Sequence, residues 1–154
     1  MIYFISDTHF GHANIVKMCE QPYPDVEAMN EALITAWNER VHGDDTVYII
    51  GDMFFRCSDP ESILKRLKGK KWLIVGNHDG SWMDKVDLNH YFVSVGNYLE
   101  TTDGVHGMTI CHYPPRATRT SVIEPSRSTT NCIITRPCVP FSCAIVGYLI
   151  FLPK

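Results

Sequence analysis

Residues 72–79 have the sequence WLIVGNHD, in which four apolar residues run directly into Gly76, Asn77, His78 and Asp79. A short apolar run bounded by Gly or Asp is typical of a buried β-strand. The side chains that follow the run include types that bind metal ions or phosphate. The sequence therefore predicts a buried strand whose end carries chemical function.

The same arrangement, an apolar run that stops at potential ligands, occurs three more times. The runs and the residues that follow them are 1–6 with Asp7-Thr8-His9, 46–50 with Gly51-Asp52, and 105–111 with His112-Tyr113-Pro114. Loops that leave a rigid scaffold commonly carry binding and catalytic residues. We therefore expect four strand ends that together carry the function.

Helical periodicity fills the segments between these strands. Apolar residues recur every three or four positions over residues 25–41, which predicts an amphipathic helix. Asp59-Pro60 is typical of a helix start, with a carboxylate at the N-cap and proline in the first turn, and Gly69 is expected to end that helix. Two short strands are expected within 91–100. Strands that alternate with helices predict an α/β protein.

Composition supports one globular domain. The chain has 154 residues, of which 45% are hydrophobic and 11% aromatic, which excludes a chain without a core. A net charge of −3 argues against a general nucleic-acid binder.

The longest apolar run, 141–152, is shorter than the roughly 20 residues of a membrane span. Because Met1 leads into an apolar run without a basic start, no signal peptide is expected, and we predict a cytoplasmic protein with reduced thiols.

The strand ends offer a mixed set of metal ligands. Asp7 and His9 are two residues apart, and a carboxylate with an imidazole suits Mn²⁺, Fe or Zn²⁺ better than Ca²⁺. Asp52 adds a carboxylate that can bridge two ions, Asn77 an amide oxygen and His112 a second imidazole. Two ions about 3.5–4 Å apart clamp a phosphoryl group during hydrolysis. Each of these short motifs is common by itself, but four of them at successive strand ends in this order are specific evidence for a metal site.

In these blocks the sequence resembles the calcineurin-like metallophosphoesterases, in particular their small single-domain members, over about residues 1–114. The resemblance implies a four-layer α/β/β/α sandwich with a dinuclear metal centre at the strand ends. The ligands it implies are Asp7 and His9 on the first metal, Asp52 bridging both, and Asn77 and His112 on the second. The two ions, Mn²⁺ first among the candidates, would lower the pKa of a bridging water and make hydroxide available for in-line attack.

The resemblance also implies roles in proton transfer and substrate binding. His78 would donate a proton to the leaving oxygen or stabilise its charge, with Asp79 orienting its imidazole. Asn77 would lie beside the substrate as well as the metal. His12 is expected either near the substrate or in a supporting or surface position. Arg56 would either bind a phosphate oxygen or remain a solvated loop cation, and the second reading is favoured from sequence.

The last quarter of the chain departs from this pattern. The family's remaining block, Gly-His-x-His, would supply one imidazole to each metal, yet no histidine follows His112. Half of residues 117–154 are Ser, Thr, Pro, Cys or Arg, and only Glu124 is acidic. We therefore divide the chain into a metallophosphoesterase-like domain, 1–116, and an atypical tail, 117–154. A frameshift or recombined end would explain the tail, and a divergent subfamily is the alternative.

Three functions follow from these observations. The first is a metal-dependent phosphoesterase acting on phosphomonoesters or phosphodiesters, with a small phosphate ester or nucleotide as partner and neither nucleic acid nor membrane. The second is a truncated or frameshifted family member with little activity. The third is a zinc-binding module built on Cys132, Cys138 and Cys143, whose spacing does not match structural zinc sites. The sequence carries no signal for an oligomeric state.

Overall fold

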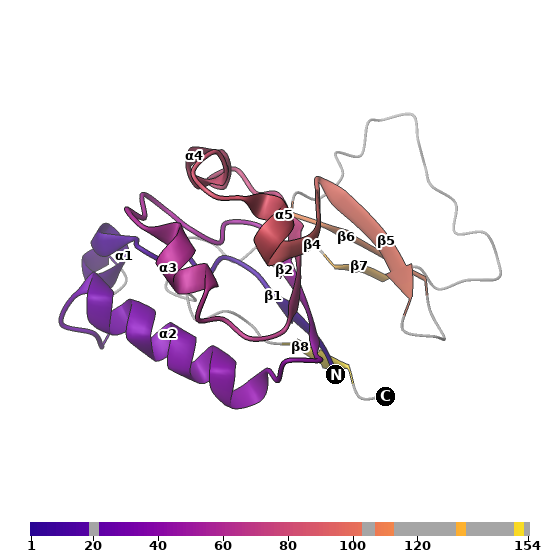
Figure 1. The fold of residues 1–154 in the computed structure, drawn as a ribbon, viewed down its shortest axis with the longest axis horizontal. Coiled ribbons are helices and arrows are strands. Elements are labelled where there is room, and N and C mark those ends of the chain that lie inside the picture. The colour runs from indigo at the N-terminus through magenta and orange to yellow at the C-terminus, as the bar shows by residue number, and fades with distance from the viewer. Residues whose placement is uncertain (19–21, 103–106, 113–131, 135–149, 153–154) are drawn as a thin grey trace.

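A computed structural model describes residues 1–18, 22–102, 107–112, 132–134 and 150–152. These residues form two sheets and five helices (Figure 1). The strands are β1 (Ile2–Ile5), β2 (Thr46–Ile50), β3 (Lys70–Ile74), β4 (Phe92–Gly96), β5 (Tyr98–Thr102), β6 (Gly107–Cys111), β7 (Cys132–Ile134) and β8 (Ile150–Leu152). The helices are α1 (Ala13–Met18), α2 (Val26–Arg40), α3 (Pro60–Leu64), α4 (Gly80–Met83) and α5 (Leu88–Tyr91).

The first sheet has the strand order β4-β3-β2-β1-β8. Strands β1 to β4 are parallel, so the carboxyl ends of β1, β2 and β3 lie at one edge of the sheet. Four of the five residues of β2 are buried, as expected for a central strand that is covered on both faces. The strands expected from apolar runs at 1–6, 46–50 and 72–75 are therefore confirmed, in parallel register.

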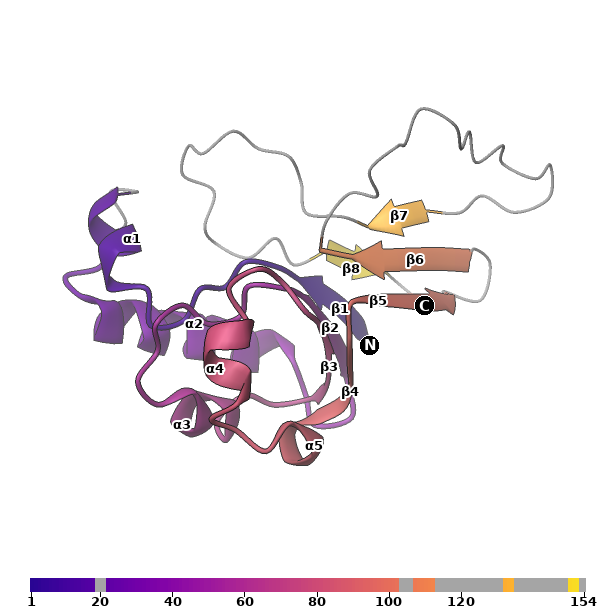
Figure 2. The same cartoon turned by 90° about the horizontal axis from the view of Figure 1, so that it is seen from above.

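The second sheet has the order β5-β6-β7 and packs against the first (Figure 2). Between the sheets lies a core of Phe4, Tyr48, Ile50, Ile74 and Ile110. The helices lie on the other side of the first sheet. The helices form one layer and the two sheets form two more, which gives three layers of the expected sandwich. The α/β fold class is therefore confirmed over the described residues.

Helix starts follow the predicted capping chemistry. Asp25 accepts a hydrogen bond from the Ala28 amide at 2.7 Å at the start of α2. Asp59 accepts one from the Ser62 amide at 3.1 Å at the start of α3. Helix α3 ends at Leu64, well before Gly69, because the chain continues in turns. None of the helices in the described ranges is long and apolar enough to cross a membrane.

Most of the predicted tail, 117–154, lies outside the described residues. Asp103-Gly104, a dipeptide typical of a tight hairpin turn, also lies outside them. Two short tail segments are described. Strand β7 pairs in parallel with β6. Strand β8, from the end of the apolar run 141–152, pairs antiparallel with β1. The division into domain and tail stays a prediction.

Candidate metal centre

The loops that leave β1 and β2 run side by side and hold the first candidate ligands. The amides of Asp7 and His9 donate hydrogen bonds to the carbonyls of Gly51, at 3.0 Å, and Asp52, at 3.1 Å. The Thr8 hydroxyl donates to the Met53 carbonyl at 2.9 Å. These bonds extend the pairing of β1 with β2 beyond the sheet, so ligands far apart in the sequence become neighbours.

Backbone strain is concentrated at these ligands. Asp7, His9 and Asp52 have φ angles of 52°, 46° and 54°, in the left-handed region. Such conformations cost of order 1–3 kcal/mol each and cluster at functional sites. Asp and His tolerate this region better than most residues, which is one reason why these residue types occupy the loops.

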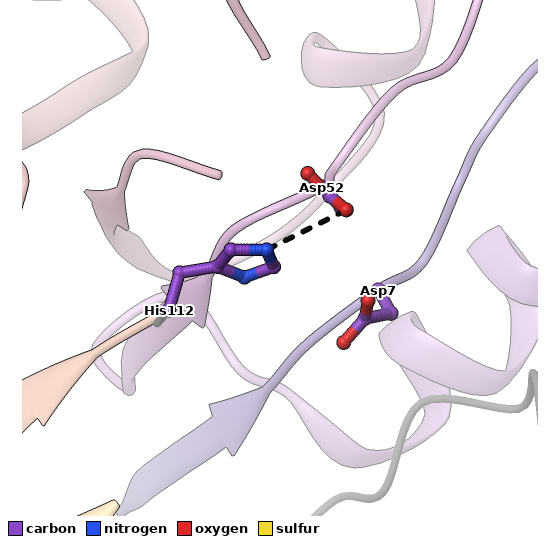
Figure 3. A group of neighbouring side chains, drawn as sticks. All are labelled: Asp7, Asp52 and His112. Carbon is purple, nitrogen blue, oxygen red and sulfur yellow. Dashed lines mark ion pairs between the residues drawn. The ribbon is translucent and has the colours of Figure 1, made fainter. Parts of the chain in front are cut away.

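Three side chains, Asp7, Asp52 and His112, converge at the strand ends (Figure 3). Each contributes one ligand atom, and these atoms lie within 4.8 Å of one another. His112 Nε2 lies 3.6 Å from Asp52 Oδ2, and both side chains are almost completely buried. The three residues follow β1, β2 and β6, so the group forms only when the two sheets are packed together.

Hydrogen bonding of His112 favours a cation at this point. Its Nδ1 lies 2.9 Å from the Ile50 carbonyl, which can only accept, so Nδ1 carries the proton. In the neutral imidazole, Nε2 then has a lone pair, and it lies 3.2 Å from Asn77 Oδ1 and near the Asp52 carboxylate. Metal-binding histidines commonly donate their other N–H to a carbonyl in this way. The donor set therefore fits a divalent metal ion.

His9 and Asn77 complete the set of five predicted ligands. His9 Nε2 lies 3.8 Å from Asp7 Oδ1 and 3.9 Å from Asp52 Oδ2. Its Nδ1 is buried and has no hydrogen-bond partner within the described ranges. Asn77 is exposed and approaches the site through its contact with His112. All five predicted ligands thus lie together, while their binding of metal stays a prediction.

The two residues after Asn77 have different surroundings. The His78 amide donates to Asp52 Oδ1 at 2.9 Å, and the half-buried His78 ring lies next to His9, with 5.6 Å between ring centroids. The fully buried Asp79 carboxylate accepts hydrogen bonds from three backbone amides and from the Trp82 indole. None of these bonds comes from the His78 imidazole, and the orienting role that the family resemblance implies for Asp79 stays a prediction.

His12 and Arg56 meet at Phe55, which the sequence does not single out as part of a site. The Phe55 ring lies 4.0 Å from the His12 ring and 4.7 Å from the His78 ring, centroid to centroid. The exposed Arg56 has its guanidinium carbon 5.4 Å from the Phe55 centroid. Burial, with the nearby charges of His9, His78 and Arg56, lowers the pKa of His12 to about 4.

Two supporting residues were not found from the sequence. Asn30, on α2, accepts a hydrogen bond from the Gly11 amide at 3.0 Å and so fixes the turn that carries His12. Trp82 lies three residues after Asp79 and donates to it at 2.9 Å. Asn30 falls on the expected helix and Trp82 near a recognised motif, but neither partner is visible without the fold.

Comparison with known proteins agrees with the geometry. The sequence matches the model of the calcineurin-like phosphoesterase family over residues 1–130, which include all nine candidate site residues. An uncharacterized protein of Methanocaldococcus jannaschii is 37% identical over 142 residues, covering 84% of this chain and 79% of the archaeal protein. Gene 66 protein of Mycobacterium phage L5 is 35% identical over 82 residues, covering 51% of this chain and 39% of the phage protein.

A solved structure has the same fold. The crystal structure of a protein of unknown function from Aquifex aeolicus superposes with a TM-score of 0.61 at 31% sequence identity. The similarity covers 74% of this chain and 61% of the Aquifex chain, so this chain matches less than two thirds of that protein's length. The family match, by contrast, spans most of this sequence. The chain therefore belongs to the calcineurin-like phosphoesterase family.

Proposed function

We propose that this chain is a metal-dependent phosphoesterase that hydrolyses phosphomonoesters or phosphodiesters. One observation carries the proposal: potential ligand atoms of Asp7, Asp52 and His112 lie within 4.8 Å of one another at the strand ends, and Asn77 Oδ1 lies 3.2 Å from His112 Nε2. Carboxylate, amide and imidazole groups gathered in this way suit a divalent metal ion. Family membership supports phosphoester hydrolysis as the chemistry that the cation serves.

The proposed centre binds two divalent ions through the five residues described above. Asp7 and His9 would hold the first ion, Asp52 both, and Asn77 and His112 the second. Carboxylate, amide and imidazole ligands suit Mn²⁺, our first choice, and also Fe and Zn²⁺. Such ions polarise a phosphoryl oxygen and lower the pKa of water.

The remaining roles fall to residues around the centre. The His78 imidazole would donate a proton to the leaving oxygen, because its ring lies beside His9 and its amide is bonded to Asp52. His12 and the Arg56 guanidinium, both packed on Phe55, would orient the phosphate. A small phosphate ester or nucleotide is the proposed substrate, and the cytoplasm is the proposed compartment.

A second candidate is a family member with little or no activity. It is favoured by the absence of any histidine after His112, since the Gly-His-x-His block would give each ion one more ligand. Fewer ligands weaken metal binding and leave the reacting water less well positioned. The same assay separates the two candidates.

The assay is hydrolysis of bis-p-nitrophenyl phosphate against added Mn²⁺, with Asp52→Asn as the test variant. The variant keeps an oxygen for the His78 amide but loses the negative charge. We expect turnover to fall by at least about 100-fold, because removing even an outer partner of a metal ligand costs 10–100-fold. Asp84→Asn, an exposed carboxylate exchange, is the matched control and should keep full turnover.

Unchanged turnover in Asp52→Asn would reject the phosphoesterase proposal. Absence of turnover in folded wild-type protein at millimolar Mn²⁺ would instead favour the second candidate.

A further inference from the structure

We propose that Asp79 is a positioning residue that holds the backbone carrying Asp52 and Asn77 in a metal-binding conformation. This inference rests on the proposed metal-dependent function and assigns Asp79 a role that does not act through the His78 imidazole. The carboxylate joins the loop after β2 to the loop after β3, so the two loops would keep or lose their geometry together.

The hydrogen bonds of Asp79 join these two loops directly. Its Oδ2 accepts from the Asp52 amide at 2.9 Å and from the Gly76 amide at 2.8 Å. Its Oδ1 accepts from the Met53 amide and from the Trp82 indole, both at 2.9 Å. Side chains that accept four hydrogen bonds while fully buried are held in one orientation, because each lost bond leaves a buried donor unpaired.

Only a carboxylate satisfies all four donors. Ionised Asp has two acceptor oxygens and no donor, whereas the amide of Asn has one oxygen and one NH₂ group. In Asp79→Asn, whichever way the amide turns, its NH₂ group faces two N–H donors. One pair of bonds, either that of Asp52 and Gly76 or that of Met53 and Trp82, is then replaced by a repulsive contact.

The backbone at Asp52 and Gly76, which Asp79 holds, is strained and closely packed. Asp52 has a φ of 54°, a strained conformation that needs support from its surroundings. Gly76 packs so closely that a Cβ on it would lie 2.3 Å from Asp52 Oδ1. The His78 amide, next to Asn77, bonds to that same Oδ1. Release of the Asp79 carboxylate would therefore let the Asp52 and Asn77 side chains move apart.

The test compares Mn²⁺ affinity, measured by electron paramagnetic resonance of free Mn²⁺, in four forms of the full chain. The forms are wild type, Asp79→Asn, Trp82→Phe and Asp84→Asn, each checked for folding by circular dichroism. We expect Asp79→Asn to bind Mn²⁺ about 10–100-fold more weakly, in the range of losses from altered ligand support. Trp82→Phe keeps all three backbone bonds, so it should lower the melting temperature while Mn²⁺ affinity falls by less than about 10-fold, the lower limit expected for Asp79→Asn.

Equal affinity in folded Asp79→Asn and wild type would overturn the proposal, and it would do so even if turnover were lost, because that result indicates a role through His78. If wild type binds Mn²⁺ without hydrolysing phosphate esters, the proposed function fails while the affinity comparison still decides the role of Asp79. Failure of wild type to bind Mn²⁺ would overturn both.

Hydrogen exchange in wild type gives a second test that needs no variant and covers the case in which Asp79→Asn fails to fold. Because one carboxylate oxygen bonds both the Asp52 and the Gly76 amides, they should open together. We expect one shared opening free energy for both amides, and a parallel slowing of both when Zn²⁺ is added. Independent opening of the two amides would overturn the proposal.

Discussion

Gly51→Ala tests how closely the strand ends are packed around the candidate centre. A Cβ on Gly51 would lie 2.3 Å from His112 Nδ1 and 2.8 Å from the Gly76 Cα atom. Gly51 also has a φ of +71° and accepts the Asp7 amide at its carbonyl. The substitution therefore acts on the strand end that carries Gly51 and on the other three strand ends that form the site.

Two contributions set the expected magnitude. Alanine in the left-handed region costs roughly 1–2 kcal/mol, and overpacking of a filled site typically costs 1–3 kcal/mol. Together they predict a loss of about 2–5 kcal/mol in the free energy of unfolding. For a chain of this size each kcal/mol lowers the melting temperature by roughly 2–4 °C, so a decrease of about 4–20 °C is expected.

Urea unfolding followed by far-ultraviolet circular dichroism, without metal, measures the loss. Gly80→Ala is the matched control, because in the described part of the chain no atom beyond its chain neighbours and its own helix backbone lies within 4 Å of a Cβ built there. Gly80 begins α4, where alanine should leave the free energy of unfolding unchanged or raise it by up to about 1 kcal/mol. A loss of less than about 1 kcal/mol in Gly51→Ala would show that the site relaxes freely, contrary to the close packing argued here.

Three further predictions concern capping, buried charge and metal. Asp25→Ala removes the acceptor of the Ala28 amide, and urea unfolding should show a loss of about 1 kcal/mol; no loss would exclude a capping contribution. Burial lowers the pKa of Lys71 from 10.5, so between the lowered value and 10.5 the unfolded chain binds more protons and stability rises with pH. The stability of wild type relative to Lys71→Met should therefore increase as the pH rises toward 10.5, and a constant difference in paired urea titrations would contradict this. Mn²⁺ at about 100 times its dissociation constant should stabilise wild type by roughly 2.7 kcal/mol. In thermal melts Asp52→Asn should shift far less, and equal shifts would argue against the site.

Local sequence signals predicted the elements that depend on local chemistry. The carboxylates of Asp25 and Asp59 cap helices as expected, because N-capping involves residues only three positions apart. Buried strands were recognisable as apolar runs, since a strand covered on both faces has no polar side. The short helices α1, α4 and α5 were not predicted, because four to six residues hold too few turns for a period to show.

The site was predictable as a set of residues and not as a set of contacts. Asp7, Asp52, Asn77 and His112 were recognisable because each follows a strand. The first three follow parallel strands that end at one edge of the first sheet, whereas His112 follows a strand of the second sheet. The bonds of Asp79 join it to amides 26 and 27 residues earlier, and backbone donors carry no residue-type signal. The contacts of Phe55 with two histidine rings likewise depend on loop conformation.

The hydrogen bond from His112 to the Ile50 carbonyl has a consequence for the order of folding. It joins residues 62 positions apart and crosses from one sheet to the other. Contacts of such sequence separation carry a larger loop-closure entropy than local contacts. The first three strand ends can assemble within one sheet, whereas the last ligand arrives only when the second sheet docks. Metal ions that bind only after the second sheet has docked would shift the equilibrium toward the native state by mass action.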